Sequence, residues 1–380
     1  HIRGIPVPAQ GFMLATARPN EISKFQLKKG QVALTKDSET RDDIGISTYI
    51  ADDFENVILG YHCALISPNK DILDGCYLNA LLHTDYAKKY FACNASGSGQ
   101  RYALSVEALN SFPVPIIPLH EQKQIGEIFS ALDKKIELNR QINQNLEAMA
   151  KQLYDYWFVQ FDFPNEEGKP YKSSGGEMVW NEKLKRNIPV GWHCGNLFEI
   201  AVFTNGLACQ KFRPKDDEVP LPVIKIREMH DGISVDTEEV TSNIPESVKV
   251  YNGDVLFSWS ASLEVMLWAY GLGGLNQHIF KVTSANDFPK SFYYFQLLDY
   301  VDVFKKMAEA RKTTMGHITQ DHLQQSTIAI PDNKDIADKF EELISPIFKQ
   351  IVKLQEEISN FIKQRDELLP LLMNGQITIE

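Results

Sequence analysis

Lysine and arginine side chains gather in several short stretches of this chain, some of them beside glutamine or histidine. Lys and Arg hold phosphate groups, and Arg, Asn and Gln can form paired hydrogen bonds with the edges of bases. The candidate residues for such contacts are Lys28, Lys36, Arg41, Lys88, Gln100 and Arg101 in the first half of the chain and Lys211, Arg213, Lys215, Arg227, Lys312 and His317 in the second. These residue types predict contacts to a nucleic acid, although for any single residue a solvated charged rim is an equally good explanation.

The sequence patterns of common catalytic sites are missing. The chain contains no Walker A, G-x-S-x-G, H-E-x-x-H or G-x-G-x-x-G sequence. Its histidines His62, His278 and His317 stand alone, which is more typical of structural than of catalytic residues. The five cysteines form no C-x-x-C pair and have no histidine at ligand spacing. We therefore expect no catalytic residue, no metal and no cofactor bound by this chain.

The composition is typical of a globular protein with two or three domains. The chain has 380 residues, of which 43% are hydrophobic, and a net charge of -11. An acidic chain is a poor non-specific polyanion binder, because such binding depends on a broad basic field, but local Lys and Arg can still contact phosphates. The unpaired cysteines, the lack of a signal peptide and the lack of an apolar run of ~20 residues predict a cytoplasmic protein. The chain begins with His1, so we expect an N-terminal segment to be missing.

Two long stretches, 118–163 and 331–380, carry apolar residues at helical spacing. Steps of three and four residues are typical of a coiled-coil seam, so each helix can bury its apolar stripe against the other. The seam is predicted to contain Leu132, Ile136, Leu146, Leu153 and Trp157 on the first helix and Ile347, Leu354, Ile358, Leu368 and Leu372 on the second, with Leu343 also on the second stripe.

The middle of the first helix leaves two alternatives open. Continuing the rhythm from Ile136 places Asn139 and Asn143 on the seam, where a buried Asn can fix the register at some cost in stability. Alternatively, Leu138 and Ile142 turn inward and both asparagines face water.

Residues 1–117 and 190–330 each predict a mixed α/β domain, and the second stretch repeats the first. The matching pieces occur in the same order, at a nearly constant offset: the run around Gly30 matches the run around Gly253, His62 matches His278, and a helix predicted over 73–91 matches one predicted over 292–310. Ordered matches of this kind indicate a tandem duplication.

The two copies differ in length and are separated by a distinct segment. The first copy lacks a counterpart of Trp192 through about Val223, which we interpret as truncation or disorder. Residues 164–189 are rich in Gly, Pro, Ser and charged residues, which is typical of a linker.

Four short stretches, in this order and spacing, resemble the specificity subunits of type I restriction-modification systems. They are Ile117-Pro-Leu-His-Glu121-Gln122, Tyr156-Trp157-Phe158-Val159-Gln160-Phe161, Asn187-Ile-Pro189-Val-Gly191-Trp192 and Leu371-Leu-Met-Asn-Gly375-Gln-Ile377. The resemblance covers nearly the whole chain. The second helix departs from the family pattern, since it begins Pro331-Asp-Asn-Lys-Asp335 where the family usually shows a Glu-Gln pair.

The resemblance implies an α/β fold in which two tandem target recognition domains are separated by two long helices, packed as an antiparallel coiled coil with pseudo-twofold symmetry. The implied domains are a first target recognition domain (1–117), a first spacer helix (118–163), a linker (164–189), a second target recognition domain (190–330) and a second spacer helix (331–380).

The resemblance also implies a non-catalytic DNA-binding subunit. Each domain would read one half of a bipartite asymmetric site, and the helices would set the spacing and dock two modification (methyltransferase) subunits. Restriction/translocase subunits would join, and S-adenosylmethionine, ATP and magnesium would be bound by these partners. The alternative is a structural adaptor that does not bind DNA and scaffolds protein partners through its coiled coil and duplicated domains, for which the acidic composition is the evidence.

Overall fold

The structure is a computed structural model that describes residues 13–97, 101–215, 217–260, 262–310, 318 and 320–373. The chain divides into two compact units. The first unit comprises His1–Arg140 and Asn360–Glu380, and the second unit comprises Gln141–Ser359. Each of two long helices therefore supplies residues to both units.

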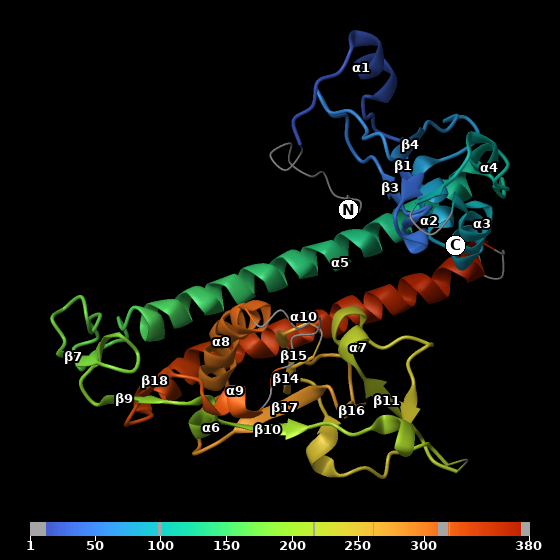
Figure 1. The fold of residues 1–380 in the computed structure, drawn as a ribbon. Helices are drawn as coiled ribbons and strands as arrows, with labels where there is room; N and C mark the ends of the chain where they lie inside the picture. Colours follow the sequence, from blue (N-terminus) through green and yellow to red (C-terminus); the bar gives the residue numbers. More distant parts are fainter. Residues whose placement is uncertain are drawn as a thin grey trace. The chain divides into compact units, whose positions relative to one another are not determined.

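The first unit has a three-stranded antiparallel sheet in the order β3-β1-β4 (Figure 1). Val32 of the central strand lies opposite Tyr49 on one side and Ile66 on the other. Its elements are α1 (Pro19–Phe25), β1 (Val32–Thr35), β2 (Asp37–Ser38), η2 (Arg41–Asp43), β3 (Ser47–Tyr49), β4 (Cys63–Ile66), α2 (Gly75–Leu82), α3 (Asp85–Asn94), β5 (Ser96–Gly97), β6 (Tyr102–Ala103) and α4 (Val106–Asn110). Alternate residues Val32 and Leu34 point inward and pack on α2 and α3, as a half-buried strand requires.

The single helix predicted over 73–91 is wrong, because the structure has two helices there, α2 and α3. Thr84 separates them: its side chain accepts a hydrogen bond from the Ala87 backbone N–H at 3.1 Å and donates one to the Leu81 carbonyl at 2.7 Å. A threonine that caps the start of α3 in this way favours a break that apolar periodicity alone does not reveal.

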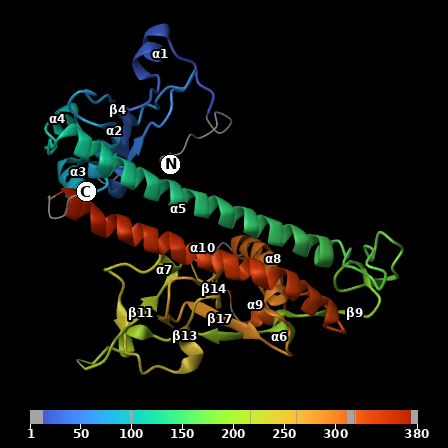
Figure 2. The same cartoon turned by 180° about the vertical axis from the view of Figure 1, so that it is seen from behind.

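The second unit contains a four-stranded antiparallel sheet in the order β10-β17-β14-β15 and a second sheet in the order β12-β11-β16-β13. Figure 2 shows β14 and β17 of the first of these sheets and β11 and β13 of the second. The strands are β7 (Met178–Asn181), β8 (Arg186–Pro189), β9 (Trp192–Gly195), β10 (Ala201–Asn205), β11 (Leu221–Ile224), β12 (Glu239–Val240), β13 (Lys249–Val250), β14 (Val255–Ser258), β15 (Glu264–Leu267), β16 (Gly273–Leu275), β17 (Ile279–Ser284) and β18 (Ile328–Pro331). The helices are α6 (Leu197–Ile200), η4 (Cys209–Lys211), α7 (Ile226–Asp231), η5 (Glu246–Val248), α8 (Lys290–Ala310) and α9 (Gln320–Gln324). Strand β9 pairs with β18, and β7 pairs with β8 within the segment predicted as a linker.

The mixed α/β class is confirmed in both units, and the two central sheets repeat one another down to single hydrogen bonds. Strands β3-β1-β4 correspond to β15-β14-β17. Before the central strand, the Lys28 N–H donates to Gln31 Oε1 at 2.7 Å, and the Tyr251 N–H donates to Asp254 Oδ2 at 2.8 Å. Identical local geometry at matching positions supports the duplication inferred from the sequence.

The two glycines that mark the repeat are required for the same reason in both units, because each adopts a positive φ. Gly30 has φ +93° and Gly253 has φ +87°, in the left-handed region that favours glycine. Gly30 N–H donates to the Ile50 carbonyl, and Gly253 N–H donates to the Trp268 carbonyl. A side chain at either position would strain the turn that starts the central strand.

The two copies differ at the edge of the sheet. In the second unit β10 pairs with β17, whereas among the described residues of the first unit no strand pairs with the outer side of β4. Likewise, no described strand of the first unit corresponds to β9. Both missing strands fall in the stretch from Trp192 to about Val223 that has no counterpart in the first copy.

The long helices are α5 (Leu119–Tyr154), which continues as the π-helical turn η3 (Asp155–Val159), and α10 (Asp335–Met373). Inside the first unit Lys135 Nζ lies 5.4 Å from the ring centroid of Phe361. Inside the second unit the Tyr154 and Phe340 ring centroids are 6.1 Å apart, and Asn143 Nδ2 donates to the Ile351 carbonyl at 3.3 Å. Within each unit, later residues of α5 thus meet earlier residues of α10, so the two segments run antiparallel.

The buried residues of each helix follow the predicted stripe, except at one position that is shifted by one residue. Fully buried members are Ile136, Trp157, Leu354, Ile358 and Leu372, and half-buried members are Leu132, Leu146, Leu153, Ile347 and Leu368. Leu343 is 49% exposed, and the neighbouring Ile344 is buried in its place. The asparagine alternative is also settled: Asn139 and Asn143 are buried, and Leu138 and Ile142 face outward.

An aromatic cluster closes α5. The Gln160 N–H donates to the Asp155 carbonyl at 2.8 Å, which is the wider turn of a π-helix. This turn allows the adjacent Trp157 and Phe158 both to be buried, where they pack against Phe340. In the part of the chain that the structure describes, every helix is too short or too polar to cross a bilayer.

Candidate nucleic-acid interface

Three of the predicted cations lie together in the first unit, where β2, β6 and the turn before β4 meet. Arg101 Nη2 donates to Asp37 Oδ1 at 2.9 Å, and His62 Nδ1 contacts the same oxygen. Partial burial raises the pKa of Asp37, but the hydrogen bonds from Arg101 and His62 outweigh it, so the pKa lies below its usual range. The carboxylate therefore stays charged and holds both side chains in place.

Aromatic rings support the other two cations. Lys36 Nζ lies 5.0 Å from the ring centroid of Tyr61, which is 81% exposed. The Arg41 guanidinium lies 5.4 Å from the ring centroid of Tyr102. We call this set the first-unit cluster: Lys36, Asp37, Arg41, Tyr61, His62, Arg101 and Tyr102. Exposed cations beside flat aromatic rings can contact phosphates and bases together.

The second unit builds the same backbone frame from different side chains. In the first unit the Lys36 N–H donates to the His62 carbonyl at 3.0 Å, and the Lys36 carbonyl accepts from Leu104 at 2.7 Å. In the second unit Trp259 takes the position of Lys36: its N–H donates to the His278 carbonyl at 3.3 Å, and its carbonyl accepts from Ile318 at 3.1 Å. His278 thus corresponds to His62, as the sequence repeat indicates.

Two side-chain amides lie beside Trp259 and His278, one against each ring. The indole N–H donates to Asn205 Oδ1 at 3.2 Å, which leaves the amide N–H groups of Asn205 without a partner among the described residues. Gln277 Nε2 lies 3.3 Å from His278 Nε2, and the Trp259 and His278 ring centroids are 5.6 Å apart. We call this set the second-unit cluster: Asn205, Trp259, Gln277 and His278. Amide side chains of this kind can read base edges.

Sequence reasoning missed Tyr61, Asn205, Trp259 and Gln277 because it searched for charge. The signal that could have found them is the repeat itself. Aligning Gly30 with Gly253 places Trp259 opposite Lys36, although one is an aromatic and the other a cation.

The remaining cations predicted in the first unit lie apart from the cluster. Lys28 precedes β1, whereas Lys36 follows it, so the two are at opposite ends of that strand. Lys88 is on α3 and pairs with Asp85 at 3.8 Å. Gln100, Lys312 and His317 lie outside the described residues.

The predicted cations of the second unit fall into two kinds. Lys211, Arg213 and Lys215 are exposed on the segment between β10 and β11, and none of them has an ion-pair partner in the described part of the chain. Arg227 instead donates from Nε and Nη2 to Glu228 Oε1, at 3.0 and 2.7 Å. Because Glu228 is only 1% exposed, Arg227 is committed to neutralising a buried carboxylate.

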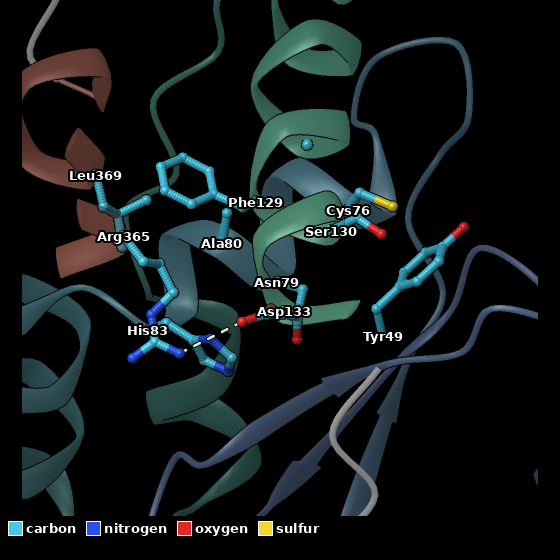
Figure 3. Close-up of a pocket in the computed structure, with 11 residues that line it drawn as sticks. Tyr49, Cys76, Asn79, Ala80, His83, Phe129, Ser130, Asp133, Arg365 and Leu369 are labelled. Carbon is cyan, nitrogen blue, oxygen red and sulfur yellow. Dashed lines mark hydrogen bonds and ion pairs between the residues drawn. The ribbon is translucent and has the colours of Figure 1, made fainter. Parts of the chain in front are cut away.

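A cavity in the first unit has titratable walls but little room (Figure 3). Its volume is about 20 Å³, enough for a single water. Asp133 and Arg365 form an ion pair of 3.3 Å on one side, and burial raises the pKa of the Cys76 thiol on the other. Within the described residues no group of three or more His, Cys, Asp or Glu could hold a metal ion. The cavity is too small for a substrate or an organic cofactor.

Sequence comparisons connect the whole fold to one family. The model of the type I restriction modification DNA specificity domain matches residues 14–148 and 189–367. The chain is 25% identical to the type I restriction enzyme MjaIX specificity subunit of Methanocaldococcus jannaschii, over 82% of this chain and 71% of that protein. It is 24% identical to the type I restriction enzyme HindI specificity subunit of Haemophilus influenzae, over 93% of this chain and 88% of that protein.

A solved structure shares the fold. The crystal structure of the S subunit of a type I restriction-modification system from M. genitalium superposes with a TM-score of 0.56. The alignment covers 92% of this chain and 84% of that one at 14% identity.

Proposed function

Because the chain belongs to the type I restriction modification DNA specificity family, we propose that it is the non-catalytic, sequence-specific DNA-binding subunit of a type I restriction-modification complex. Each α/β unit reads one half of a bipartite asymmetric site in double-stranded DNA. The first-unit cluster contacts one half-site and the second-unit cluster the other.

The observation that carries this proposal is one hydrogen-bonded frame that presents two different sets of side chains. Lys36 and Trp259 occupy the same backbone position, and each is held between a histidine-bearing turn and the residue that leads to the next helix. Duplicated frames with unlike reading residues are what an asymmetric bipartite site requires, since a symmetric site would be served by two identical surfaces.

The charge distribution fits a DNA-binding protein that depends on a few local phosphate contacts. The net charge of -11 opposes non-specific adhesion to DNA, whereas Lys36, Arg41 and Arg101 concentrate positive charge at one place in the first unit. Lys211, Arg213 and Lys215 supply cations in the second. These groups position the duplex through its phosphates, and the amides and aromatic rings contribute specificity.

In this proposal α5 and α10 set the distance between the half-sites and dock two modification (methyltransferase) subunits. Restriction/translocase subunits complete the complex, and S-adenosylmethionine, ATP and magnesium are bound by these partners. Removing two turns, about seven residues, from each long helix should shorten the unread spacer between the half-sites. An unchanged spacer in a correctly assembled complex would contradict the spacing role.

The deciding experiment is co-expression of the chain with its cognate modification subunit, followed by mapping of N6-methyladenine across the host genome. We expect methylation at one bipartite motif that disappears when the chain is omitted. Tyr61→Ala should relax one half of the motif and Asn205→Ala the other, while the exposed Lys169→Ala serves as the matched control. If the complex assembles but no motif appears, the protein-scaffold alternative becomes the better account.

A further inference from the structure

Arg101 in the first-unit cluster is fixed on one side and open on the other. Its Nη2 donates to Asp37 Oδ1 at 2.9 Å, and His62 Nδ1 contacts both of these atoms, so the two neighbours lie on the same side of the guanidinium group. An arginine carries five N–H groups in a planar fork. Apart from Asp37 and His62, no described side chain accepts from them. An edge with two parallel N–H groups therefore stays open to a partner.

The carboxylate of this pair is covered, whereas the guanidinium group is not. The side chain of Asp37 is 12% exposed and that of Arg101 is 56% exposed. A duplex that docks on the cluster can therefore reach Arg101, while Asp37 can act on DNA only through Arg101. Asp37 is in this sense a positioning residue.

The backbone on both sides of the ion pair is fixed by the small sheet β2-β6-β5. Strand β2, which begins at Asp37, pairs with β6, and the Asp37 N–H also donates to the His62 carbonyl at 3.2 Å. Arg101 directly precedes β6, and its carbonyl oxygen would lie only 2.0 Å from a Cβ placed on Gly97 of β5. Because both partners start from a constrained backbone, the guanidinium group loses little further freedom when it binds.

A neutralised arginine is better suited to a base than to a phosphate. Phosphate binding depends on net positive charge, because each neutralised phosphate releases a counterion, and the Asp37 carboxylate offsets the charge of Arg101. Lys36 and Arg41 lie beside aromatic rings instead and form no ion pair with a described acid, so they keep their charge for phosphates. Base recognition depends on the direction of two N–H groups, which the ion pair fixes.

We propose that Arg101 reads a guanine in the major groove of the first half-site, donating to O6 and N7, with Asp37 as its positioning residue. Guanine presents two acceptors at this edge, whereas adenine presents one acceptor and one donor, which the fork of N–H groups cannot match. The inference rests on the proposed function and refines it: of the three clustered cations, Arg101 contacts a base rather than a phosphate. A G·C pair is then required at one position of that half-site.

The test repeats the N6-methyladenine map with three variants of the chain in the assembled complex. Arg101→Lys keeps the positive charge but replaces the fork with a single ammonium group. Asp37→Asn keeps the shape and removes the charge of the carboxylate. Both should lower the preference for G·C at one and the same position by about tenfold or more and leave the other positions unchanged. Asp71→Asn, an exposed control beyond the other end of β4, should preserve the whole motif.

A salt titration with the duplex separates base recognition from a purely structural ion pair. Asp37→Asn releases the charge of Arg101, so its affinity for unrelated DNA should rise and the slope of log affinity against log salt should steepen by up to about one. Arg101→Lys conserves charge and should leave the slope unchanged. A purely structural ion pair predicts instead that Asp37→Asn binds every sequence more weakly.

The outcomes separate this inference from the proposed function. Absence of any motif with the unaltered chain would overturn the proposed function and this inference with it. A motif that Arg101→Lys and Asp37→Asn leave unchanged, or relax at an A·T pair or at two different positions, would overturn this inference alone. So would a general loss of affinity in Asp37→Asn. Arg101→Lys, a change at an exposed side chain, keeps the test decisive if Asp37→Asn does not assemble.

Discussion

Trp259 and Lys36 occupy equivalent backbone positions in the two units: the N–H of each donates to a histidine carbonyl, and the carbonyl of each accepts from a residue two positions before a helix. The frame is conserved between the copies, but the chemistry that it presents is not. A cation binds mainly phosphate, whereas an indole ring binds through apolar and stacking contact.

This difference predicts unlike effects of salt. Lys36→Ala should weaken binding to the cognate duplex and lower the slope of log affinity against log salt by about one, because one fewer counterion is released. Trp259→Ala should cost a comparable affinity, roughly tenfold, with the slope unchanged. Fluorescence anisotropy between about 50 and 200 mM salt measures both quantities. Equal slopes for the two variants would contradict the assignment of Lys36 to a phosphate.

Arg227 and Lys211 should separate stability from DNA binding. Arg227→Ala leaves the buried Glu228 carboxylate without its counter-charge, so the chain should unfold at a clearly lower urea concentration. Lys211→Ala, an exposed change in the same unit, should leave the unfolding midpoint unchanged and weaken DNA binding. If Arg227→Ala left the midpoint where it was, the ion pair would not be structural.

The native Asn143 side chain should make the pair of long helices less stable than an apolar side chain would at the same position. Its Oδ1 is buried without a partner, and such a group costs roughly 1–3 kcal/mol. Asn143→Leu should therefore raise the free energy of unfolding by an amount in that range, measured by urea denaturation. Asn145→Leu, at an exposed position of the same helix, is the control and should change it little. A destabilised Asn143→Leu variant would indicate that the amide sets the register of the helices.

His193 should make stability depend on pH. Its ring contacts Asp332 at 2.6 Å and Glu199 at 3.2 Å, and although burial lowers its pKa, these hydrogen bonds raise it above the ordinary 6.5. The protonated ring is thus bound more tightly in the folded state, and its stabilisation is complete below pH 6.5.

That contribution is lost as the pH rises through the folded pKa of His193. The urea midpoint should therefore fall from pH 6.5 upward, and His193→Gln should flatten this part of the profile. A variant profile parallel to that of the unaltered chain would assign the pH dependence to another group.

Much of the fold could be predicted because it depends on periodicity and on backbone constraints that few residues satisfy. The apolar stripes that include Ile136 and Ile358 required two long helices, and Gly30 and Gly253 marked the same left-handed turn. The break at Thr84 could not be predicted in this way, because a side-chain cap outweighs an apolar pattern that continues across it.

The candidate interface was less accessible to sequence reasoning, since residue type does not reveal which partner a side chain already has. Arg227 is of a residue type that commonly binds phosphate, yet its guanidinium group donates to the buried carboxylate of the next residue, Glu228. Trp259 has no charge, yet it occupies the position of Lys36. Both facts depend on tertiary contacts that composition does not encode.

The sharing of α5 and α10 between the two units fixes the order in which the chain can be completed during synthesis. Leu369 and Leu372, near the end of α10, pack on Tyr77 of α2 and on Phe129 of α5 within the first unit. Domains usually fold as they leave the ribosome, with the N-terminal one first. Here the sheet of the first unit and the helices α2 and α3 that cover it emerge early, but Tyr77 of α2 and Phe129 of α5 stay uncovered until Leu369 and Leu372 have been translated. The first unit is therefore completed only after α10 has been translated, although its own sheet is made long before.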